Sequence, residues 1–238
     1  MTVDVLFTAW NRLDYTRVTY ELLIENTDWS SVRRLIVYDD ASVDGTAEYL
    51  ADAIYRCPAA SIFESRERGG PVAMMLDYLR AQSDRADAFV KIDNDIAVPP
   101  GWLPTLLDTA SRYPDVELLG MQAGMTGEPP DGYGDPYEVR YCSHIGGVGL
   151  MRVPAFRDRP PMVADGRFGF TQWQERHGVT TAWVMPDLRC PQLDLIPDEP
   201  FASLSAVYTR VGWQRQWPPY HPASRSLWSW IPTRTETT

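Results

Sequence analysis

Short apolar runs alternate with stretches of helical period through the first half of the chain. The apolar runs predict strands at residues 3–7, 35–38, 61–63, 88–92 and 116–120. Apolar residues spaced three or four apart predict helices at residues 14–26, 44–54, 69–82 and 102–111, with Asp44 as the N-cap of the second helix. This order predicts an α/β fold with a mostly parallel central sheet flanked by helices.

The alternation changes after Gly120. Residues 125–137 are rich in Gly, Pro and Asp, which predicts a long loop. Strands are then predicted at residues 145–153 and 180–184, and helices at residues 170–177 and 202–211. We predict one domain over residues 1–196 and a C-terminal extension over residues 197–238. The extension is aromatic and proline-rich, and its stretch 213–230 fits no element pattern.

The charge balance limits the partners that the chain can bind. The formal net charge is −10 over 238 residues, which argues against binding to nucleic acid, since that requires clustered Lys and Arg. A phosphate-bearing ligand would need local compensation from a cation, an arginine cluster or a helix N-terminus.

The compartment is predicted from three features. The first residues carry no basic segment ahead of an apolar run, so they do not resemble a signal peptide. No transmembrane segment is predicted, because no apolar run approaches about 18 residues. Cys57, Cys142 and Cys190 are widely spaced and odd in number, which suggests neither disulfides nor a zinc site. A cytoplasmic location is the simplest expectation.

Polar residues follow the ends of several predicted strands. They occupy residues 8–12 after the first strand, 39–46 after the second and 93–95 after the fourth. Ligands of open parallel sheets bind at the carboxyl ends of the strands. We therefore expect the functional site at this edge of the sheet.

Two acidic groups stand out at that edge. Asp93 and Asp95 are spaced i, i+2 in extended chain, so both side chains would lie on one side, ~7 Å apart, where carboxylates suit Mg²⁺ or Mn²⁺. Alternatively, Asp93 and Asp95 belong to an acidic turn that only begins a loop and binds no metal. Asp39 and Asp40 are adjacent acids, which either cap turns or require a hydrogen-bond donor from protein or ligand.

Four segments resemble, in order and spacing, the motifs of family 2 glycosyltransferases with the GT-A fold, a Rossmann-like nucleotide-binding fold. Residues 37–46, VYDDASVDGT, resemble the VDDxSxDGT signature, and residues 6–12 resemble the first-strand motif. Residues 91–95 resemble the D-x-D strand, and residues 146–152, GGVGLMR, resemble the GG…R strand beside the acceptor site. The resemblance covers about residues 2–185.

The resemblance implies a nucleotide site. Thr8 and Asp40 would contact the base, with Asp40 accepting from a ring N–H, and Arg66 or Arg68 would lie near the base or phosphates. Asp93 would lie at the ribose and diphosphate. The full set of predicted nucleotide-binding residues is Thr8, Asn11, Arg12, Asp40, Arg66, Arg68, Asp93 and Asn94.

The resemblance also implies a divalent metal, Mn²⁺ or Mg²⁺. Asp95 would be the direct ligand, with Asp93 beside it. Asp194 lies after the last predicted strand, roughly where relatives place a further ligand. The predicted metal ligands are therefore Asp93, Asp95 and Asp194.

The catalytic base is where the sequence departs from the family. Inverting members carry an acidic pair after the GG strand, and Thr171 and Gln172 stand at the comparable positions here. The nearest carboxylates are Asp165, in a glycine-flanked loop, and Glu175, which also fits a solvated helix position. Asp165 and Glu175 are the two candidate catalytic residues.

The predicted activity is metal-dependent transfer of a sugar from a nucleoside-diphosphate donor (UDP, dTDP or GDP) to the hydroxyl of a small molecule or glycan, with inversion. One alternative is a sugar-1-phosphate nucleotidyltransferase, although residues 8–12 lack the glycine-rich loop of that class. Another is an inactive member that binds a sugar nucleotide or a protein partner. A phospho-acceptor regulator would leave residues 93–95 unexplained.

Overall fold

The strands of the computed structural model form one mixed sheet. The structure describes residues 1–81, 86–121, 139–142, 145–159, 169–184, 188, 190–196, 199–210 and 231. Within them, an 8-stranded sheet has the order β3-β2-β1-β4-β7-β5-β8-β6. The strands are β1 Val3–Ala9, β2 Val32–Asp39, β3 Ala60–Ser65, β4 Ala88–Asp93, β5 Leu118–Gly120, β6 Val139–Cys142, β7 Gly149–Arg152 and β8 Thr181–Val184.

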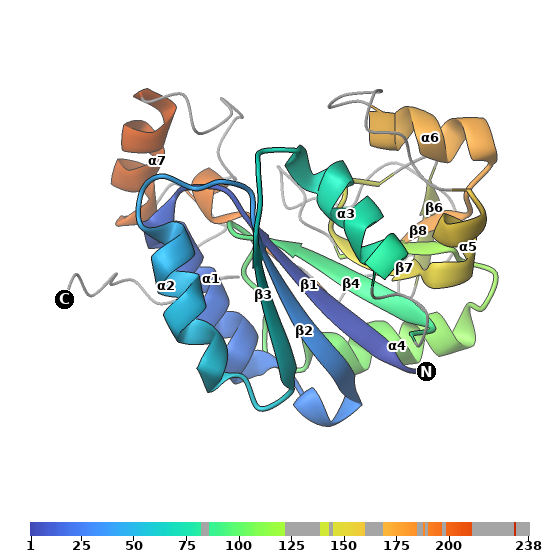
Figure 1. Ribbon diagram of the computed structural model, residues 1–238. Coiled ribbons are helices and arrows are strands. Elements are labelled where there is room, and N and C mark those ends of the chain that lie inside the picture. Colours follow the sequence, from blue (N-terminus) through green and yellow to red (C-terminus); the bar gives the residue numbers. More distant parts are fainter. Residues whose placement is uncertain are drawn as a thin grey trace.

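One half of the sheet is parallel. Strand β1 pairs in parallel with β2 and β4, and β2 pairs in parallel with β3. Strand β7 is antiparallel to both β4 and β5, and β6 is antiparallel to β8. The predicted α/β class with a mostly parallel central sheet is confirmed. The carboxyl ends of β1, β2, β3 and β4 meet at one edge of the sheet (Figure 1).

Helices cover both faces of the sheet (Figure 1). The described helices are α1 Leu13–Asn26, α2 Thr46–Ala53, α3 Gly70–Ala81, α4 Trp102–Arg112, α5 Val153–Asp158, α6 Gly169–His177 and α7 Phe201–Arg210. Buried residues of α1, α2 and α4 share one core cluster with one face of the sheet. Those of α3, α5 and α6 form a second cluster on the opposite face.

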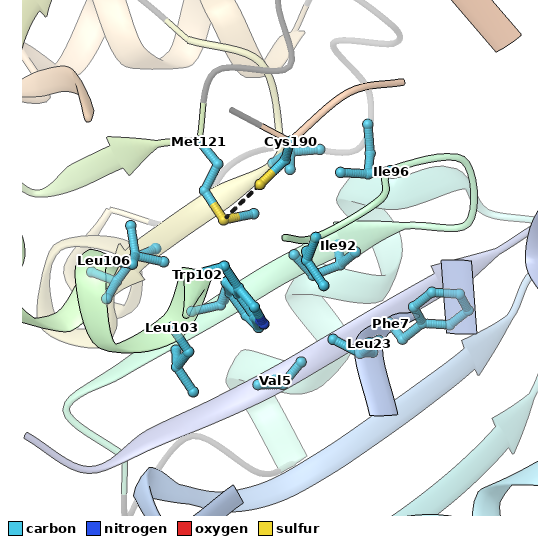
Figure 2. Packing of buried hydrophobic residues seen from close by; sticks show 14 of the residues in the cluster. Val5, Phe7, Leu23, Ile92, Ile96, Trp102, Leu103, Leu106, Met121 and Cys190 are labelled. Carbon is cyan, nitrogen blue, oxygen red and sulfur yellow. Dashed lines mark hydrogen bonds between the residues drawn. The ribbon is translucent and has the colours of Figure 1, made fainter. Parts of the chain in front are cut away.

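The core on the α1 and α4 side is built around large side chains (Figure 2). Trp102 of α4 is fully buried among residues that include Val5 and Phe7 of β1. The thiol of Cys190 donates to the sulfur of Met121 at 3.9 Å in the same layer. The segment that contains Cys190 is thereby held against this core.

A third cluster joins α7 to α1. Phe201 lies 6.3 Å from Tyr15, centroid to centroid, and Tyr208 lies 5.2 Å from it. Leu193 and Leu195 of the 3₁₀ turn η5, Leu193–Leu195, belong to this cluster. The cluster places η5 beside the beginning of α1, at the carboxyl edge of β1.

Two local predictions are corrected. The N-cap of α2 is Gly45, with φ 91°, and not Asp44. The Asp44 carboxylate instead accepts from the backbone N–H of Thr46 at 3.2 Å and from that of Leu13 at 3.0 Å, so it tethers the starts of two helices. The strand predicted at residues 145–153 is only β7, Gly149–Arg152, since residues 145–148 are not in a strand and α5 begins directly after Arg152 with a proline in its first turn.

Some predictions lie outside the described residues, namely the loop at residues 125–137, the stretch 213–230 and Asp165. Among the described residues, no helix combines the length and apolar character needed to cross a membrane.

Candidate functional site

The loops after β1 and β2 adopt an uncommon backbone conformation. Asn11, Arg12 and Ala41 have φ angles of 54°, 64° and 60°, in the left-handed region that few residues other than glycine occupy. Such residues persist where surrounding contacts hold them, and they cluster at functional sites. All three lie at the carboxyl edge that the sequence singles out.

Asn11 and Asn94 hold these loops together. The Asn11 side-chain oxygen accepts from the backbone N–H of Val43 at 2.8 Å. The Asn94 amide donates to the Asn11 carbonyl and to the Thr16 hydroxyl, both at 2.7 Å. Both asparagines are buried beneath the edge. The structure therefore gives both side chains a scaffolding function at the predicted nucleotide site.

Arg12 lies between two carboxylates. Its Nη1 is 3.0 Å from Oδ2 of Asp95 and 3.5 Å from Oδ2 of Asp194. Its Nη2 donates to the side-chain oxygen of Asn94 at 3.3 Å. The side chains of Arg12, Asp95 and Asp194 are 14%, 6% and 2% exposed. Burial alone would lower the pKa of Arg12, but the charges of Asp95 and Asp194 outweigh it and raise that pKa.

Asp95 and Asp194 come together because a distant segment pairs with the end of β4. The Leu193 N–H donates to the Asp95 carbonyl at 2.7 Å, and the Gln192 amide donates to Oδ2 of Asp95 at 3.0 Å. Gln192 also forms an antiparallel bridge with Ile96. These bonds carry Asp194 to the edge, where the sequence places a further metal ligand.

Asp93 is engaged by a buried lysine. Lys91 lies on the same face of β4, is 1% exposed, and pairs through its Nζ with Oδ1 of Asp93. The Thr8 hydroxyl donates to the same oxygen at 2.6 Å. Burial raises the pKa of Asp93, but the Lys91 charge and these hydrogen bonds outweigh it and hold the pKa below its ordinary value. Asp93 is therefore a carboxylate in the folded protein, with one oxygen already satisfied.

Asp39, the last residue of β2, and Asp40, which follows it, both accept hydrogen bonds, as adjacent buried acids require. Asp40 accepts from the backbone N–H groups of Gly69 and Gly70, at 2.7 Å and 2.9 Å. Asp39 accepts from the Ser42 N–H at 3.0 Å and the Ser65 hydroxyl at 3.3 Å. Asp40 therefore joins β2 to the beginning of α3.

The two arginines before α3 differ in their surroundings. Arg66 forms an ion pair with Asp77 of α3. The Arg68 guanidinium carbon lies 3.4 Å from the centroid of the Trp10 ring, so its plane lies against that ring at the end of β1. Arg68 thus borders the loop that follows β1, while Arg66 is held to α3.

Of the two candidate bases, the structure describes Glu175. It is exposed on α6, next to Gln174, whose buried side chain exchanges hydrogen bonds of 2.9 Å and 3.0 Å with the backbone of Ile145. Gln174 thus anchors α6 to the segment that precedes β7, and Glu175 is exposed to solvent.

Two polar residues at the edge were not among the predicted site residues. Lys91 is a charge inside an otherwise apolar strand, two positions before Asp93, and that pattern could have indicated it. Gln192 carries no comparable signal. It reaches Asp95 across 97 residues of chain, through a bridge that only the tertiary structure forms.

The donor set fits a divalent cation in type, but the described residues supply only part of the ligands that such a cation takes. Carboxylates of Asp95 and Asp194 converge on one point, and hard oxygen donors are the ligands of Mg²⁺ and Mn²⁺. Arg12 Nη1 stands at that point. Within the described ranges, no group of three or more His, Cys, Asp or Glu is arranged to hold a metal.

Two solved structures of glycosyltransferases are similar to this chain in fold. S. aureus TarS 1–349 in complex with UDP-GlcNAc matches with a TM-score of 0.62 at 13% identity, over 80% of this chain and 58% of that chain. The mannosyltransferase PcManGT from Pyrobaculum calidifontis, in complex with GDP-Man and Mn²⁺, matches with a TM-score of 0.58 at 15% identity. The match covers 91% of this chain and 65% of that chain. These likenesses show a GT-A glycosyltransferase fold.

The chain spans only part of these proteins, and 36% of a longer TarS structure. The sequence model of glycosyl transferase family 2 matches residues 4–150, more than half of the 238 residues. The chain belongs to glycosyl transferase family 2. No curated protein matches it in sequence.

Proposed function

We propose that this chain transfers a sugar from a nucleoside-diphosphate donor to an acceptor hydroxyl, with a divalent cation and with inversion at the anomeric carbon. The observation that supports this is the convergence of Asp95, Asp194 and Arg12 at the carboxyl edge of β1 and β4, in a chain of glycosyl transferase family 2. Similar folds bind UDP-GlcNAc in TarS and GDP-Man with Mn²⁺ in PcManGT.

The donor nucleotide would lie across the ends of β1, β2 and β4. Thr8 and Asp40 would contact its base, and the Trp10–Arg68 stack would border it. Although Asp40 already accepts from Gly69 and Gly70, each carboxylate oxygen has a further lone pair for a ring N–H. Asp93 would lie at the ribose and diphosphate.

Asp95 and Asp194 would hold the cation, which neutralises charge on the diphosphate as it departs. Arg12, which contacts both acids before a ligand binds, supplies a second positive charge that suits phosphate oxygens. These groups resolve the conflict between an acidic chain of formal charge −10 and an anionic donor.

The transfer is a single displacement. The acceptor oxygen forms a bond to the anomeric carbon while the bond from that carbon to the diphosphate breaks, and the electron pair leaves with the nucleoside diphosphate. The acceptor proton passes to a carboxylate. Asp165 is our proposed base, because Glu175 is exposed on α6.

The test is calorimetric titration of the protein with UDP, GDP and dTDP, with and without Mn²⁺. We expect one diphosphate to bind only with Mn²⁺, and Asp95→Asn to weaken that binding by about 100-fold, as expected when a buried charged ligand is lost. Asp108→Asn is the matched control, because Asp108 is an exposed acid on α4 that pairs with its helix neighbour Arg112.

If none of the three diphosphates binds, the assignment of Asp40 and Asp95 is refuted. Binding without hydrolysis or transfer of the corresponding donor would instead favour an inactive member, a reading that Thr171 and Gln172 in place of the acidic pair would explain.

A further inference from the structure

Arg12 occupies the point at which a cation would contact both acids of the site. Its Nη1 contacts Oδ2 of Asp95 at 3.0 Å and Oδ2 of Asp194 at 3.5 Å. A divalent ion contacts carboxylate oxygens at about 2.0–2.6 Å, so the ion and the guanidinium cannot occupy this point together. The two cations must exclude one another.

We propose that Arg12 is a resident cation that keeps free divalent ions out of the Asp95–Asp194 pair. The metal enters only together with a nucleoside diphosphate, whose phosphate oxygens take the Arg12 guanidinium away from the carboxylates. This inference rests on the proposed function for the identity of the diphosphate, but its first part concerns Arg12 and the metal alone.

The position of Arg12 is built by the fold. Its backbone is in the left-handed region at φ 64°, immediately before α1, and its Nη2 is held by Asn94 at 3.3 Å. Asn94 is itself fixed by Asn11 and Thr16. A surface arginine paired by chance would not require this strained backbone and buried support.

The charges explain why one cation must be present. Asp95 and Asp194 are 6% and 2% exposed, and two buried carboxylates that face one point repel each other unless a positive charge lies between them. Arg12 supplies it before any ligand binds. A free Mn²⁺ ion must displace that charge, and a guanidinium left without an acceptor in a buried site is costly.

A diphosphate removes this cost. The guanidinium binds phosphate oxygens as well as carboxylates, with the same planar arrangement of donors. Buried Nε of Arg12 has no hydrogen-bond acceptor among the described residues, so the guanidinium has a further donor to offer. Metal and nucleotide would therefore bind with positive coupling, which is reciprocal in their affinities.

The experiment measures free Mn²⁺ by electron paramagnetic resonance while the protein is titrated in the absence of nucleotide. We expect Arg12→Met to bind Mn²⁺ at least about tenfold more tightly than the wild type, since a unit charge at this distance is removed. Arg17→Met is the matched control, because it removes an arginine from α1, the helix that begins directly after Arg12, and Arg17 lies near Tyr49 instead of the acids. The Mn²⁺ affinity of the Arg17→Met control should equal that of the wild type.

The second arm repeats the titration with UDP, GDP or dTDP, whichever binds in the calorimetric test. The diphosphate should raise the Mn²⁺ affinity of the wild type by a larger factor than that of Arg12→Met. Equal Mn²⁺ affinity of the wild type and Arg12→Met without nucleotide, including no binding by either, would overturn the proposal. So would tight binding of free Mn²⁺ by the wild type.

Folding of the variant is followed in the same samples. Arg12→Met removes the positive charge between two acids, and Mn²⁺ should therefore raise its melting temperature more than it raises that of the wild type, because a ligand that binds the folded state more tightly stabilises that state more. If Arg12→Met does not fold even with Mn²⁺, Arg12→Gln is used in the same titrations. If no nucleotide binds, the proposed function is refuted. The Mn²⁺ affinities of the wild type and Arg12→Met without nucleotide still decide whether Arg12 excludes free metal.

Discussion

Lys91 and Asp93 form an ion pair at the carboxyl edge whose cationic partner is almost fully buried. The lysine is 1% exposed and the aspartate 34%, so the aspartate can still face a ligand while the lysine cannot reach water. Gly147 lies over the ammonium, where a Cβ would stand 3.8 Å from Nζ. The pair thus joins β4 to the glycine segment that precedes β7.

Asp93→Asn leaves that ammonium buried without a counter-charge. We expect a loss of about 3 kcal/mol in the free energy of unfolding, at the lower end of the range for a broken buried pair because Asp93 is partly exposed. Urea denaturation measures it. In the double variant with Lys91→Met much of the loss should be recovered, and a coupling free energy below about 0.5 kcal/mol would contradict the pairing.

Individual acids of the site were predictable, whereas their partners were not. Asp93, Asp95 and Asp40 follow strands in the sequence, and strand ends define the edge. The pairing of Arg12 with Asp95 and Asp194 depends on a left-handed backbone at a residue that is neither glycine nor asparagine. No local pattern predicts that conformation for arginine.

At the scale of elements, the junction between β3 and α3 fixes Asp40. Gly70 has φ 76°, and a Cβ on Gly69 would lie 2.8 Å from the Cβ of Ala73. The N–H groups of both glycines donate to Asp40. The two glycines therefore allow the chain to bring its backbone donors to the end of β2.

Gly69→Ala should disrupt this junction, because the methyl group meets a side chain that has no freedom to rotate away. We expect a loss of about 1–3 kcal/mol in the free energy of unfolding and weaker nucleotide binding through Asp40. Gly146→Ala is the control, because no atom lies within 4 Å of its Cβ position. Equal denaturation midpoints for Gly69→Ala, the control and the wild type would contradict this account.

Most elements of the parallel half were predictable, with ends displaced by a few residues. Each has a strong period and a clear boundary, as in β1, α1 and β4. A strand was predicted where β7 lies, but its antiparallel insertion between β4 and β5 was not, nor were the short strand β6 and the helix α5. Strands of four residues contain too few positions to show a period, and their pairing is non-local.

At the scale of the molecule, the helix α7 supports the site, since the Ser205 hydroxyl on α7 donates to the Asp194 carbonyl at 3.2 Å. Phe201 is fully buried against Tyr15, whose hydroxyl donates to the Phe201 carbonyl at 3.3 Å. The same cluster contains Leu193 and Leu195, which flank Asp194. The predicted division at residue 196 thus separates two stretches that share one hydrophobic cluster.

Phe201→Ala should lower the free energy of unfolding by about 3–5 kcal/mol, the usual cost of an aromatic cavity in a core. Val207→Ala, on the same helix and 49% exposed, should change it by less than about 0.5 kcal/mol. Urea denaturation followed by circular dichroism compares them. If residues 197–238 behaved as a separate unit, Phe201→Ala would leave the main unfolding transition unchanged, and that result would contradict this account.

By itself, the sequence determined the α/β class and the family, and it predicted the edge at which the site lies. These follow from periodicity, from the residues that end each strand and from motifs in order, all of which are local in the chain. The positions of Asp165 and of residues 125–137 stay predictions, as do the catalytic, nucleotide and metal functions assigned to individual residues.

Only the tertiary structure decided that Arg12 stands between Asp95 and Asp194, and that Lys91 satisfies Asp93. Asp194 arrives through the bridge between Ile96 and Gln192 and through packing of α7 on α1. The physical reason is that buried charges are satisfied by whichever opposite charges the fold brings within a few ångströms, and that proximity is set by strand order and packing between segments far apart in sequence.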